Sequence, residues 1–429
     1  MGVKLGLIGT GTVGGGCLDI INTHKQDFLH HYGIDLEVAR VCSRNPDQAI
    51  SHGYGDCFTS DFHDIINDPD IDIVIELIGG TTTAKDIVMG ALAAGKQVVT
   101  ANKALMATSG EEILDLADKM HCEVAFEASV GGGIPIIVPL KHSLISNEVS
   151  SILGIVNGTT NYILTLMAES GINYSDALAL AQEKGFAEAD PTADVDGLDA
   201  AAKIAILASI AFNTRITMDQ VYHEGIRLIL PTDLTAAQDM GYCVKLLALA
   251  NRTDEGIDVR VHPTMVPLDH PLAAVNGVDN AIYVKGDAVG ETMFYGEGAG
   301  AGPAASAVMG DVLETARRLQ AGCQPFVGCT CTDALPLVPM ENLTTRYYIR
   351  FEVEDRSGVL AATANVFSNH DVSVYSVIQR GKNEGGTVDL VYITHTARER
   401  DIRKVLSDIR CLEGVLVDDS EPTVIRVQK

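Results

Sequence analysis

The chain has 429 residues and no tryptophan; 46% of its residues are hydrophobic and only 5% are aromatic. Its 31 basic and 57 acidic side chains give a formal net charge of −26, which excludes proteins that follow a nucleic-acid phosphate backbone. So few aromatic residues also exclude a stacking platform for single strands, and a chain of this length is expected to form two or three domains.

The first predicted elements form a dinucleotide site. Val3–Ile8 is an apolar strand, and an apolar helical pattern runs through Ile21. Between them lies a GxGxxG loop, which consists of Gly9, Thr10, Gly11, Thr12, Val13 and Gly14. In this context the first glycine forms the turn, the second lets the backbone approach a pyrophosphate, and the third lets the helix pack on the strand. The phosphates would lie at the helix N-terminus.

Strands and helices alternate through the following residues, which indicates a doubly wound α/β sheet. The predicted strands are Leu36–Val41, Ile71–Ile78, Gln97–Thr100 and Glu123–Glu127, and the predicted helices are Ala84–Ala94 and Glu111–Lys119.

The end of the second strand bears on the choice of cofactor. NAD enzymes usually carry Asp or Glu there to hold the ribose 2′-hydroxyl, whereas this chain has Cys42, Ser43 and Arg44. Because a guanidinium can hold a 2′-phosphate, we favour NADP(H) over NAD(H); a solvated Arg44 is the alternative. Thr81 and Lys103 each follow a strand, at the carboxyl edge where such sheets bind ligands, although a lysine on a loop can equally be a surface residue.

Two loops open the middle of the chain. Residues 127–135, EASVGGGIP, expose backbone carbonyls that could hold a hard cation together with Glu127, and a plain tight loop is the alternative. Residues 157–161, NGTTN, follow a predicted strand at 152–156 and precede an amphipathic helix, which suits a helix N-cap or a ligand loop.

The most conspicuous stretch is GFAEADPTADVDGLDAAAK, residues 185–203. Its carboxylates precede one lysine, Lys203, at the start of an apolar helix. Asp199 and Lys203 stand at i and i+4 and therefore share a helical face. Burial favours a neutral lysine and the carboxylate favours a charged one, a balance that suits proton transfer near neutral pH. The alternative is a solvated loop followed by an ordinary i,i+4 pair.

A second glycine loop at 298–303 leads into an alanine-rich helix, and residues 326–344 are a predicted linker. Residues 345–429 then follow a βαββαβ pattern of the ferredoxin-like type. In this pattern residues 415–417 and 424–427 together form one irregular edge strand. Asp355 through Gly358 would cap the first helix, whose amides could receive a carboxylate; a cap without a ligand is the alternative.

Six motifs together resemble homoserine dehydrogenases: GxGxVG at 9–14, ELIGG at 76–80, ANK at 101–103, EASVGGGIP at 127–135, VNGTTNYIL at 156–164, and the acidic stretch. The resemblance covers about residues 1–325. It implies a Rossmann-like NAD(P)-binding domain at 1–135, completed by a helix returning around 300–322, and an α+β catalytic and dimerisation domain at 136–325. The implied reaction interconverts L-homoserine and L-aspartate 4-semialdehyde in threonine, methionine and isoleucine biosynthesis.

The resemblance also implies roles for single residues. Lys203 is the implied proton donor, Glu188 and Asp199 bind the amino acid, and Asp199 belongs with Lys203 and Lys103 to the catalytic set. Lys103 also contacts cofactor or substrate. The nicotinamide end is approached by Gly302. A sodium site is formed by Glu127 and the carbonyls of Val130, Gly132 and Ile134.

Residues 353–367, VEDRSGVLAATANVF, resemble an ACT domain, a small amino-acid-sensing module that usually pairs with a second copy. In this enzyme family the expected effector is L-threonine, acting as a feedback inhibitor, and the implied allosteric residues are Asp355, Gly358 and Leu360. Pairing through the middle domain implies a homodimer, which pairing of the C-terminal modules could extend to a homotetramer.

Two other functions fit the sequence less well. A phosphorylating semialdehyde dehydrogenase needs an activated cysteine nucleophile, and none of the nine cysteines stands in such a motif. An amino-acid sensor on an inactive scaffold would not need Lys103, Glu188, Asp199 and Lys203 together.

The cysteines and the apolar runs bear on location. Cys329 and Cys331 lie two residues apart without a second metal-binding pair nearby and are interpreted as ordinary thiols. The N-terminus leads into a strand rather than a signal peptide, and no apolar run reaches about 18 residues. We expect a cytoplasmic protein with reduced thiols and no membrane partner.

Overall fold

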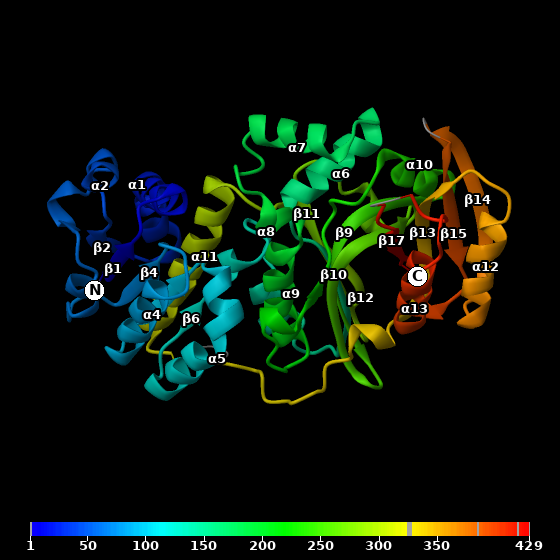
Figure 1. Cartoon of the computed structure of the whole chain (residues 1–429). Helices are drawn as coiled ribbons and strands as arrows, with labels where there is room; N and C mark the ends of the chain where they lie inside the picture. The colour runs from blue at the N-terminus through cyan, green and yellow to red at the C-terminus, as the bar shows by residue number, and fades with distance from the viewer. Residues whose placement is uncertain (1, 324–327, 384–385, 418–419, 429) are drawn as a thin grey trace. The chain divides into compact units, whose positions relative to one another are not determined.

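The computed structural model describes residues 2–323, 328–383, 386–417 and 420–428 (Figure 1). The chain forms two compact units. Unit 1 comprises Met1–Ile152, Ala202–Val221 and Asn280–Leu335, and unit 2 comprises Leu153–Ala201, Tyr222–Asp279 and Pro336–Lys429. The division falls within strand β7 (Val149–Ile155) and within helix α9 (Leu198–Ala211), so each of these elements has residues in both units.

Unit 1 contains a six-stranded parallel sheet with the order β3-β2-β1-β4-β5-β6. The strands are β1 (Val3–Ile8), β2 (Leu36–Cys42), β3 (Phe58–Thr59), β4 (Ile73–Glu76), β5 (Gln97–Thr100) and β6 (Val124–Ala125). The predicted doubly wound sheet is therefore confirmed. The chain runs outward in one direction from β1 and in the other from β4, which makes the carboxyl ends of these two strands the switch point where such sheets bind ligands.

Helices of unit 1 cover this sheet. They are α1 (Thr12–Tyr32), α2 (Pro46–Ser51), α3 (His63–Ile66), α4 (Thr83–Ala93), α5 (Lys103–Met120) and α11 (Ala301–Ala321). Leu5, Leu18 and Val308 belong to one buried core that joins β1, α1 and α11. The contact of α1 with α11 is close, because a Cβ on Gly16 would lie 2.9 Å from the Cβ of Ala305. Strands β11 (Asp279–Gly286) and β12 (Gly290–Glu297) precede α11.

The predicted start of α5 at Glu111 was wrong, because the helix begins at Lys103. The Asn102 side chain accepts the Leu105 N–H at 3.1 Å and so caps the helix. Thr108 is accommodated inside the helix, where its hydroxyl donates to the Ala104 carbonyl at 2.7 Å. Lys103 is therefore the first residue of a helix rather than part of a loop.

In unit 2 the strands follow the order β7-β9-β10-β17-β13-β15-β14, with β8 beside β10 and β16 beside β13. They are β8 (Tyr222–His223), β9 (Tyr242–Thr253), β10 (Gly256–Pro267), β13 (Thr344–Glu354), β14 (Val374–Asn383), β15 (Thr387–Thr394), β16 (Ala397–Arg398) and β17 (Thr423–Val427). The helices of unit 2 are α6 (Gly158–Ser170), α7 (Tyr174–Glu183), α8 (Thr192–Val195), α10 (Pro231–Asp239), α12 (Val359–Asn369) and α13 (Glu399–Arg410).

Residues 344–428 form a βαββαβ arrangement with its own apolar core, here called the C-terminal module. The prediction of one irregular edge strand for this module was wrong. Leu416 contributes only an isolated bridge to Val353, and β17 pairs on both sides, antiparallel with β13 and parallel with β10. A hydrophobic pattern shows that a short segment is buried but not which strands flank it. The module therefore shares a continuous sheet with β9 and β10.

A membrane-spanning element was not expected, and within the described ranges each helix is too short or too polar to cross a bilayer.

Candidate active site

The three glycines of the first loop are held by different constraints. Gly9 has a φ of 105°, and a Cβ there would lie 2.6 Å from the Leu77 carbonyl oxygen. A Cβ on Gly14 would lie 1.9 Å from the carbonyl oxygen of Gly9. A Cβ on Gly11 would meet no described protein atom within 4 Å. The first and third glycines are thus required by the fold, whereas the second leaves space in front of α1 for a ligand.

The other residues of the loop divide into buried and exposed positions. The Thr10 hydroxyl is buried and donates to Gln48 Oε1 at 3.0 Å, so Thr10 braces the loop and only its backbone is available to a ligand. Thr12 is exposed at the first position of α1, and Val13 is half-buried behind it. Gly11 is the N-cap of α1 and supplies no side-chain cap, which leaves the first amides of the helix available to an anion.

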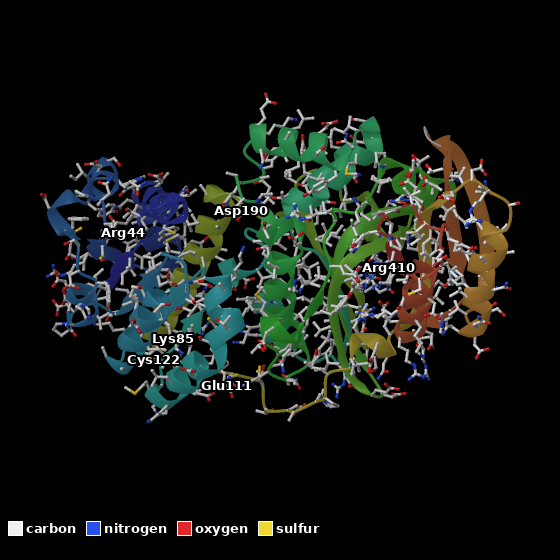
Figure 2. All side chains as sticks on the ribbon, viewed as in Figure 1. Arg44, Lys85, Glu111, Cys122, Asp190 and Arg410 are labelled. Atoms are coloured by element: carbon white, nitrogen blue, oxygen red, sulfur yellow. The ribbon has the colours of Figure 1, made fainter. Side chains whose placement is uncertain are left out.

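Two of the predicted cofactor residues beyond the loop, Arg44 and Thr81, follow strands, whereas Gly302 lies in the first turn of α11. Arg44 is exposed between β2 and α2, as Figure 2 shows. Thr81 is exposed after β4, directly behind Gly79 and Gly80, which both adopt positive φ. Arg44 and Thr81 therefore follow the two strands that flank β1, at the carboxyl edge of the same sheet.

A buried carboxylate that received no role from the sequence organises this edge. Glu76, the last residue of β4, is 0% exposed. Its Oε1 accepts the Ile78 N–H at 2.9 Å, and its Oε2 accepts the Thr100 hydroxyl at 2.7 Å. Glu76 thus ties the ends of β4 and β5 together and shapes the loop that precedes Thr81. The signal for it was a charged residue closing an otherwise apolar strand.

Asn102 and Lys103 continue the same edge. The Asn102 amide donates to the Gly80 carbonyl at 2.7 Å while its oxygen caps α5. Lys103 follows as an exposed residue on the first turn of α5. Because Asn102 fixes the start of the helix against the loop after β4, it also fixes the position from which the Lys103 side chain extends.

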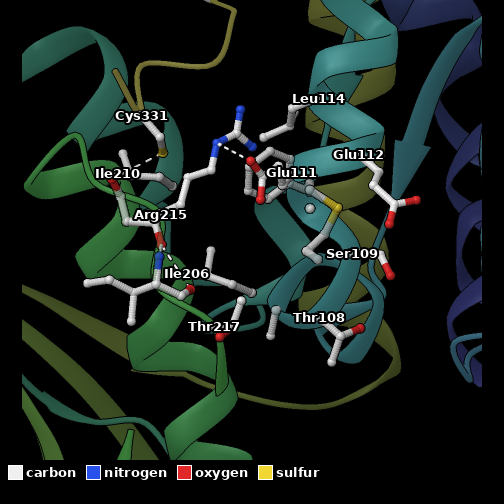
Figure 3. A pocket seen from close by; sticks show the side chains of 16 residues that line it. Thr108, Ser109, Glu111, Glu112, Leu114, Ile206, Ile210, Arg215, Thr217 and Cys331 are labelled. Carbon is white, nitrogen blue, oxygen red and sulfur yellow. Dashed lines mark hydrogen bonds and ion pairs between the residues drawn. The ribbon is translucent and has the colours of Figure 1, made fainter. Parts of the chain in front are cut away.

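Helices α5 and α9 both line a cavity of about 140 Å³ in unit 1 (Figure 3). Met106 and Gly110 of α5 line it together with Ile206 and Ile210 of α9. These positions are i+3 and i+7 from Lys103 and from Lys203, so each lysine lies on the helical face that borders the cavity. Arg215, which follows α9, pairs with Glu111 and Asp115 further along α5. The segment after α9 therefore lies beside the middle of α5.

Cys331 also lines this cavity, and neither Cys329 nor Cys331 belongs to a group of described residues that could hold a metal ion. A hydrogen bond from Cys331, together with the charges of Arg215 and Lys141, lowers the pKa of Cys329 to about 6. The same contact raises the pKa of Cys331. Cys329 is thus the thiol that ionises first, although no role in the reaction is assigned to it.

The glycine loop at 127–135 holds its glutamate firmly. Glu127 is 6% exposed, and its carboxylate accepts the N–H groups of Ile136, Ile137 and Val138, the last two at 2.8 and 2.7 Å. Burial raises the pKa of Glu127, and these three donors oppose the rise. The carboxylate therefore fixes the backbone of residues 136–138.

Two further buried carboxyls lie close to Glu127. Asp311 of α11 accepts the Glu127 N–H at 2.8 Å, and burial, followed by the charges of Glu127 and Glu123, raises the pKa of Asp311 to about 8. Burial also raises the pKa of Glu123, against the opposing charge of Arg318. Asp311 is therefore protonated in the neutral range. Among the described residues no group of three or more His, Cys, Asp or Glu side chains could hold a metal ion.

The carboxylates of the acidic stretch are organised by Asn157, which precedes Asp199 by 42 positions. Asn157, the N-cap of α6, is 6% exposed, and its amide nitrogen donates to Asp194 at 2.7 Å and to Asp199 at 3.0 Å. Its oxygen accepts the Thr160 N–H at 2.9 Å. One asparagine thus starts a helix and brings two carboxylates together. The sequence indicated its capping role but not this second one.

Asp199 and Lys203 lie on α9 as predicted, and both are buried, with exposed fractions of 5% and 9%. The remaining carboxylates differ from them. Glu188 is exposed in the loop between α7 and α8. Asp190 accepts the Thr192 N–H at 3.1 Å, and Asp196 pairs with Arg227. The structure therefore separates buried Asp199 from the carboxylates that stabilise the turn.

The predicted effector residues of the C-terminal module lie around the start of α12. Gly358 is the N-cap with a φ of 95° and supplies no side-chain cap. The Asp355 carboxylate accepts a hydrogen bond from Gln379 at 3.3 Å, so it does not cap the helix as expected. Leu360 is 47% exposed on the first turn. The amides of this helix start remain available to a carboxylate, because the cap is a glycine.

Three family models match the chain. Residues 9–127 match the NAD-binding domain of homoserine dehydrogenase, residues 135–313 match homoserine dehydrogenase, and residues 347–413 match the ACT domain.

Individual relatives cover the whole chain. A homoserine dehydrogenase from Synechocystis is 44% identical over 436 aligned residues, which cover 100% of each chain. The crystal structure of a homoserine dehydrogenase from Thiobacillus denitrificans is 39% identical with a TM-score of 0.92, covering 100% of this chain and 98% of that one. A hyperthermophilic archaeal homoserine dehydrogenase in complex with NADPH is 26% identical with a TM-score of 0.64, covering 77% of this chain and 100% of that one.

Proposed function

The chain belongs to the homoserine dehydrogenase family, and we propose that it interconverts L-homoserine and L-aspartate 4-semialdehyde with NADP(H) as the preferred cofactor. One observation carries the assignment of the site. Asp199 and Lys203 stand one turn apart on α9, both more than nine-tenths buried, and Asn157 orients the carboxylate. A buried acid and base on one helical face suit a small zwitterionic substrate and a proton transfer.

The chemistry divides between the cofactor and the chain. When bound, the nicotinamide supplies or accepts the hydride at the reacting carbon. Lys203 donates a proton to the oxygen of the aldehyde as it is reduced and accepts a proton when the alcohol is oxidised. Asp199 receives the ammonium group of the amino acid, and Glu188 provides a second carboxylate from its exposed loop. Glu188→Ala should therefore raise the KM for L-homoserine, and an unchanged KM would count against this contact.

The proposed preference for NADP(H) rests on the end of β2. No carboxylate follows this strand, Arg44 is exposed there, and one structural relative is in complex with NADPH. The space in front of Gly11 and the uncapped start of α1 would receive the pyrophosphate. The decisive measurement is kcat/KM with NADPH and with NADH, in wild type and in Arg44→Ala. We expect Arg44→Ala to have a lower kcat/KM with NADPH and an unchanged kcat/KM with NADH. A strong wild-type preference for NADH would overturn the assignment.

A sodium ion would fit the loop at 127–135 through carbonyl oxygens. The Glu127 carboxylate already accepts three N–H groups, so we assign the carbonyl oxygens of Val130, Gly132 and Ile134 as the ligands of the cation. The left-handed Gly131 and Gly132 let the loop turn these carbonyls in different directions. Comparing thermal unfolding in sodium and in choline chloride tests this, and equal Tm values would contradict it.

Regulation by L-threonine through the C-terminal module completes the proposal. An ACT-type module and the free amides at the start of α12 support an amino-acid effector. Deleting the C-terminal module is a poor test, because the deletion also removes β17 and so leaves β10 with an unpaired edge. Threonine titration of the full chain is preferable, beside Gly358→Val, which places a side chain at a φ of 95° in front of α12. Equal inhibition of both proteins would overturn this site. We further propose a cytoplasmic homodimer or homotetramer, which light scattering would resolve.

A further inference from the structure

Residues 222–228 form a short segment that touches two parts of unit 2, and it is called here the bridging segment. It includes β8 and leads to α10. On one side it contacts the turn at 194–197, within the acidic stretch. On the other it contacts β17 of the C-terminal module. Neither contact is visible in the sequence, because the partners lie about 30 and 200 residues away.

The contact with the acidic turn is close and specific. The Ile226 N–H donates to the Val195 carbonyl at 2.9 Å. Arg227 binds both oxygens of Asp196, Nε to Oδ1 at 2.5 Å and Nη2 to Oδ2 at 3.2 Å. A Cβ on residue 225 would lie 2.2 Å from the Val195 carbonyl oxygen, so only glycine permits this approach. A two-pronged guanidinium–carboxylate pair fixes orientation as well as distance.

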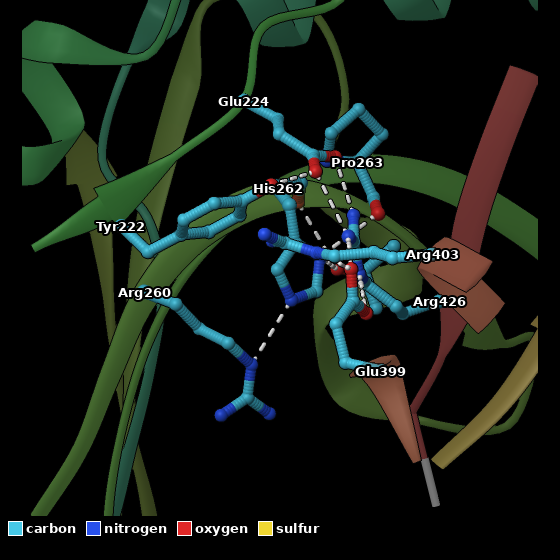
Figure 4. Close-up of polar contacts among 9 residues, drawn as sticks. Tyr222, Glu224, Arg260, His262, Pro263, Glu399, Arg403 and Arg426 are labelled. Carbon is cyan, nitrogen blue, oxygen red and sulfur yellow. Dashed lines mark hydrogen bonds and ion pairs between the residues drawn. The ribbon is translucent and has the colours of Figure 1, made fainter. Parts of the chain in front are cut away.

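The contact with the module is made by a buried arginine (Figure 4). Arg426 of β17 is 3% exposed, and its guanidinium binds Glu224 of the bridging segment and Glu399 of α13. Nη2 of Arg426 lies 2.8 Å from Glu224 Oε1 and 2.6 Å from Glu399 Oε1. Burial would lower the pKa of Arg426, but the two carboxylates outweigh it and raise this pKa, so the guanidinium stays charged.

A second pair of contacts holds the far end of the segment to the same module. The Thr423 hydroxyl of β17 donates to the Leu228 carbonyl at 3.0 Å. Arg350 of β13 donates to Thr423 at 2.6 Å and to Asp233 of α10 at 2.7 Å. Both ends of the bridging segment are therefore attached to strands of the C-terminal module, while its middle is attached to the acidic turn.

The turn leads directly into α9, which carries Asp199, the carboxylate proposed to bind the substrate. Val195 and Asp196 lie between Asp194 and Asp199, and Asn157 joins these two carboxylates. Ion pairs, a backbone hydrogen bond and the chain itself thus connect β17 with Asp199. Coupling of this kind needs an element that both sites bias, and the bridging segment meets that condition.

We infer that Glu224 and Arg227 are positioning residues for the amino-acid substrate, and that through them the C-terminal module controls the acidic turn. The inference rests on the proposed function, since it takes Asp199 as a substrate ligand. Neither residue touches the reacting atoms. Their loss should weaken the binding of homoserine while the proton transfer at Lys203 proceeds at its normal rate.

The first test compares Arg227→Gln and Arg227→Lys with Arg410→Gln, which removes an exposed arginine on α13 (Figure 2). In Arg227→Gln the KM for L-homoserine should rise about threefold or more, with kcat and the KM for NADPH within about twofold of wild type. Arg227→Lys should recover part of the loss and Arg410→Gln should change nothing. A folded Arg227→Gln with an unchanged KM for homoserine would overturn the inference, and so would a parallel rise in both KM values.

The second test does not depend on activity. Hydrogen–deuterium exchange of peptides covering 190–199 is compared in wild type and in Glu224→Gln, whose side chain keeps its shape and loses its charge. We expect faster exchange in this turn in the variant, with no change in α4 of unit 1. Equal exchange would overturn the inference even in an active enzyme. If wild type failed to oxidise homoserine, the proposed function would fall, and faster exchange would still support control of the turn by the module.

The third test measures coupling to the effector. In wild type, L-threonine and L-homoserine should change each other's affinity by one common factor, because linkage is reciprocal. In Glu224→Gln the affinity for L-threonine, measured by calorimetry, should stay close to that of wild type. The factor by which threonine changes the affinity for homoserine should move toward one. An unchanged factor would overturn the inference. If threonine failed to bind wild type, the proposed effector would be wrong, and the first two tests would decide the positioning roles.

Discussion

The glycine loop at 9–14 and the acidic stretch at 185–203 are both proposed to bind small charged molecules, but they are built differently. The glycine loop is made by neighbours in the sequence, and two of its glycines are fixed by contacts with the loop itself and with Leu77. The acidic stretch receives its geometry from Asn157 and Arg227, which lie outside it on both sides of the chain.

This difference explains which kind of site a sequence reveals. A dinucleotide loop uses backbone amides and the absence of side chains, and both are written in six consecutive residues. A group of carboxylates has no such local meaning, since some stabilise a turn and one is proposed to bind a ligand. Only distant partners separate these roles. The predictions below test this contrast, beginning with the largest expected effect.

Lys203→Met should lower kcat by about 10²- to 10⁴-fold and leave the KM for homoserine nearly unchanged. Methionine keeps the apolar stem of a side chain that is 9% exposed, so the loss reports the missing proton donor rather than a cavity. Steady-state kinetics in both directions measure it. Lys184→Met, at an exposed lysine directly before the acidic stretch, serves as the control. A near-normal kcat would show that the buried i,i+4 pair is structural. The acidic stretch would then not be a catalytic site to compare with the glycine loop.

Gly14→Ala and Gly11→Ala should fail in different ways. The new methyl at 14 would lie 1.9 Å from the Gly9 carbonyl oxygen, so we expect a loss of about 1–3 kcal/mol in the free energy of unfolding. The methyl at 11 meets open space in the protein, so unfolding should change little while the KM for NADPH rises about tenfold or more. Denaturant unfolding and cofactor kinetics separate the two. If both variants lost only stability, Gly11 would have no ligand in front of it.

Much of the fold was predictable for the same reason that the glycine loop was. The parallel strands, the helix opened by the loop and the βαββαβ order of the C-terminal module follow from local apolar periodicity. Contacts between distant segments were not predictable. Nothing near Thr423–Val427 shows that this strand lies between β10 and β13, and nothing near Glu76 shows that Thr100 is its partner. Lys103 was placed on a loop because the next helix was predicted to begin at Glu111, although Asn102, which caps the helix, was already in the sequence.

Asp311 shows that unit 1 also depends on contacts between distant segments, because its hydrogen-bond partner Glu127 lies 184 residues away. Its pKa is raised to about 8, so its stabilising contribution is complete below the unfolded value near 4 and is lost as pH rises through 8. Wild type should therefore lose about 1 kcal/mol per pH unit between pH 5 and 8 relative to Asp311→Asn, which keeps an acceptor for the Glu127 N–H. Denaturant unfolding at three pH values measures this. A gap that did not depend on pH would show that Asp311 is already ionised.

The smallest expected effect gives the closest comparison, since unit 1 and unit 2 each contain a buried asparagine that caps a helix. Asn102 accepts the Leu105 N–H at 3.1 Å, and Asn157 accepts the Thr160 N–H at 2.9 Å. Replacing either by alanine should cost about 1 kcal/mol in the free energy of unfolding, because each removes one cap.

The second hydrogen bonds of the two asparagines should then separate the variants. The amide of Asn102 donates to the backbone carbonyl of Gly80, whereas the amide of Asn157 donates to Asp194 and Asp199. We expect Asn157→Ala to raise the KM for homoserine and Asn102→Ala to leave it unchanged, at equal loss of stability. If Asn157→Ala lost only stability, the carboxylates would be held in place by the turn itself. The acidic stretch would then be as local as the glycine loop.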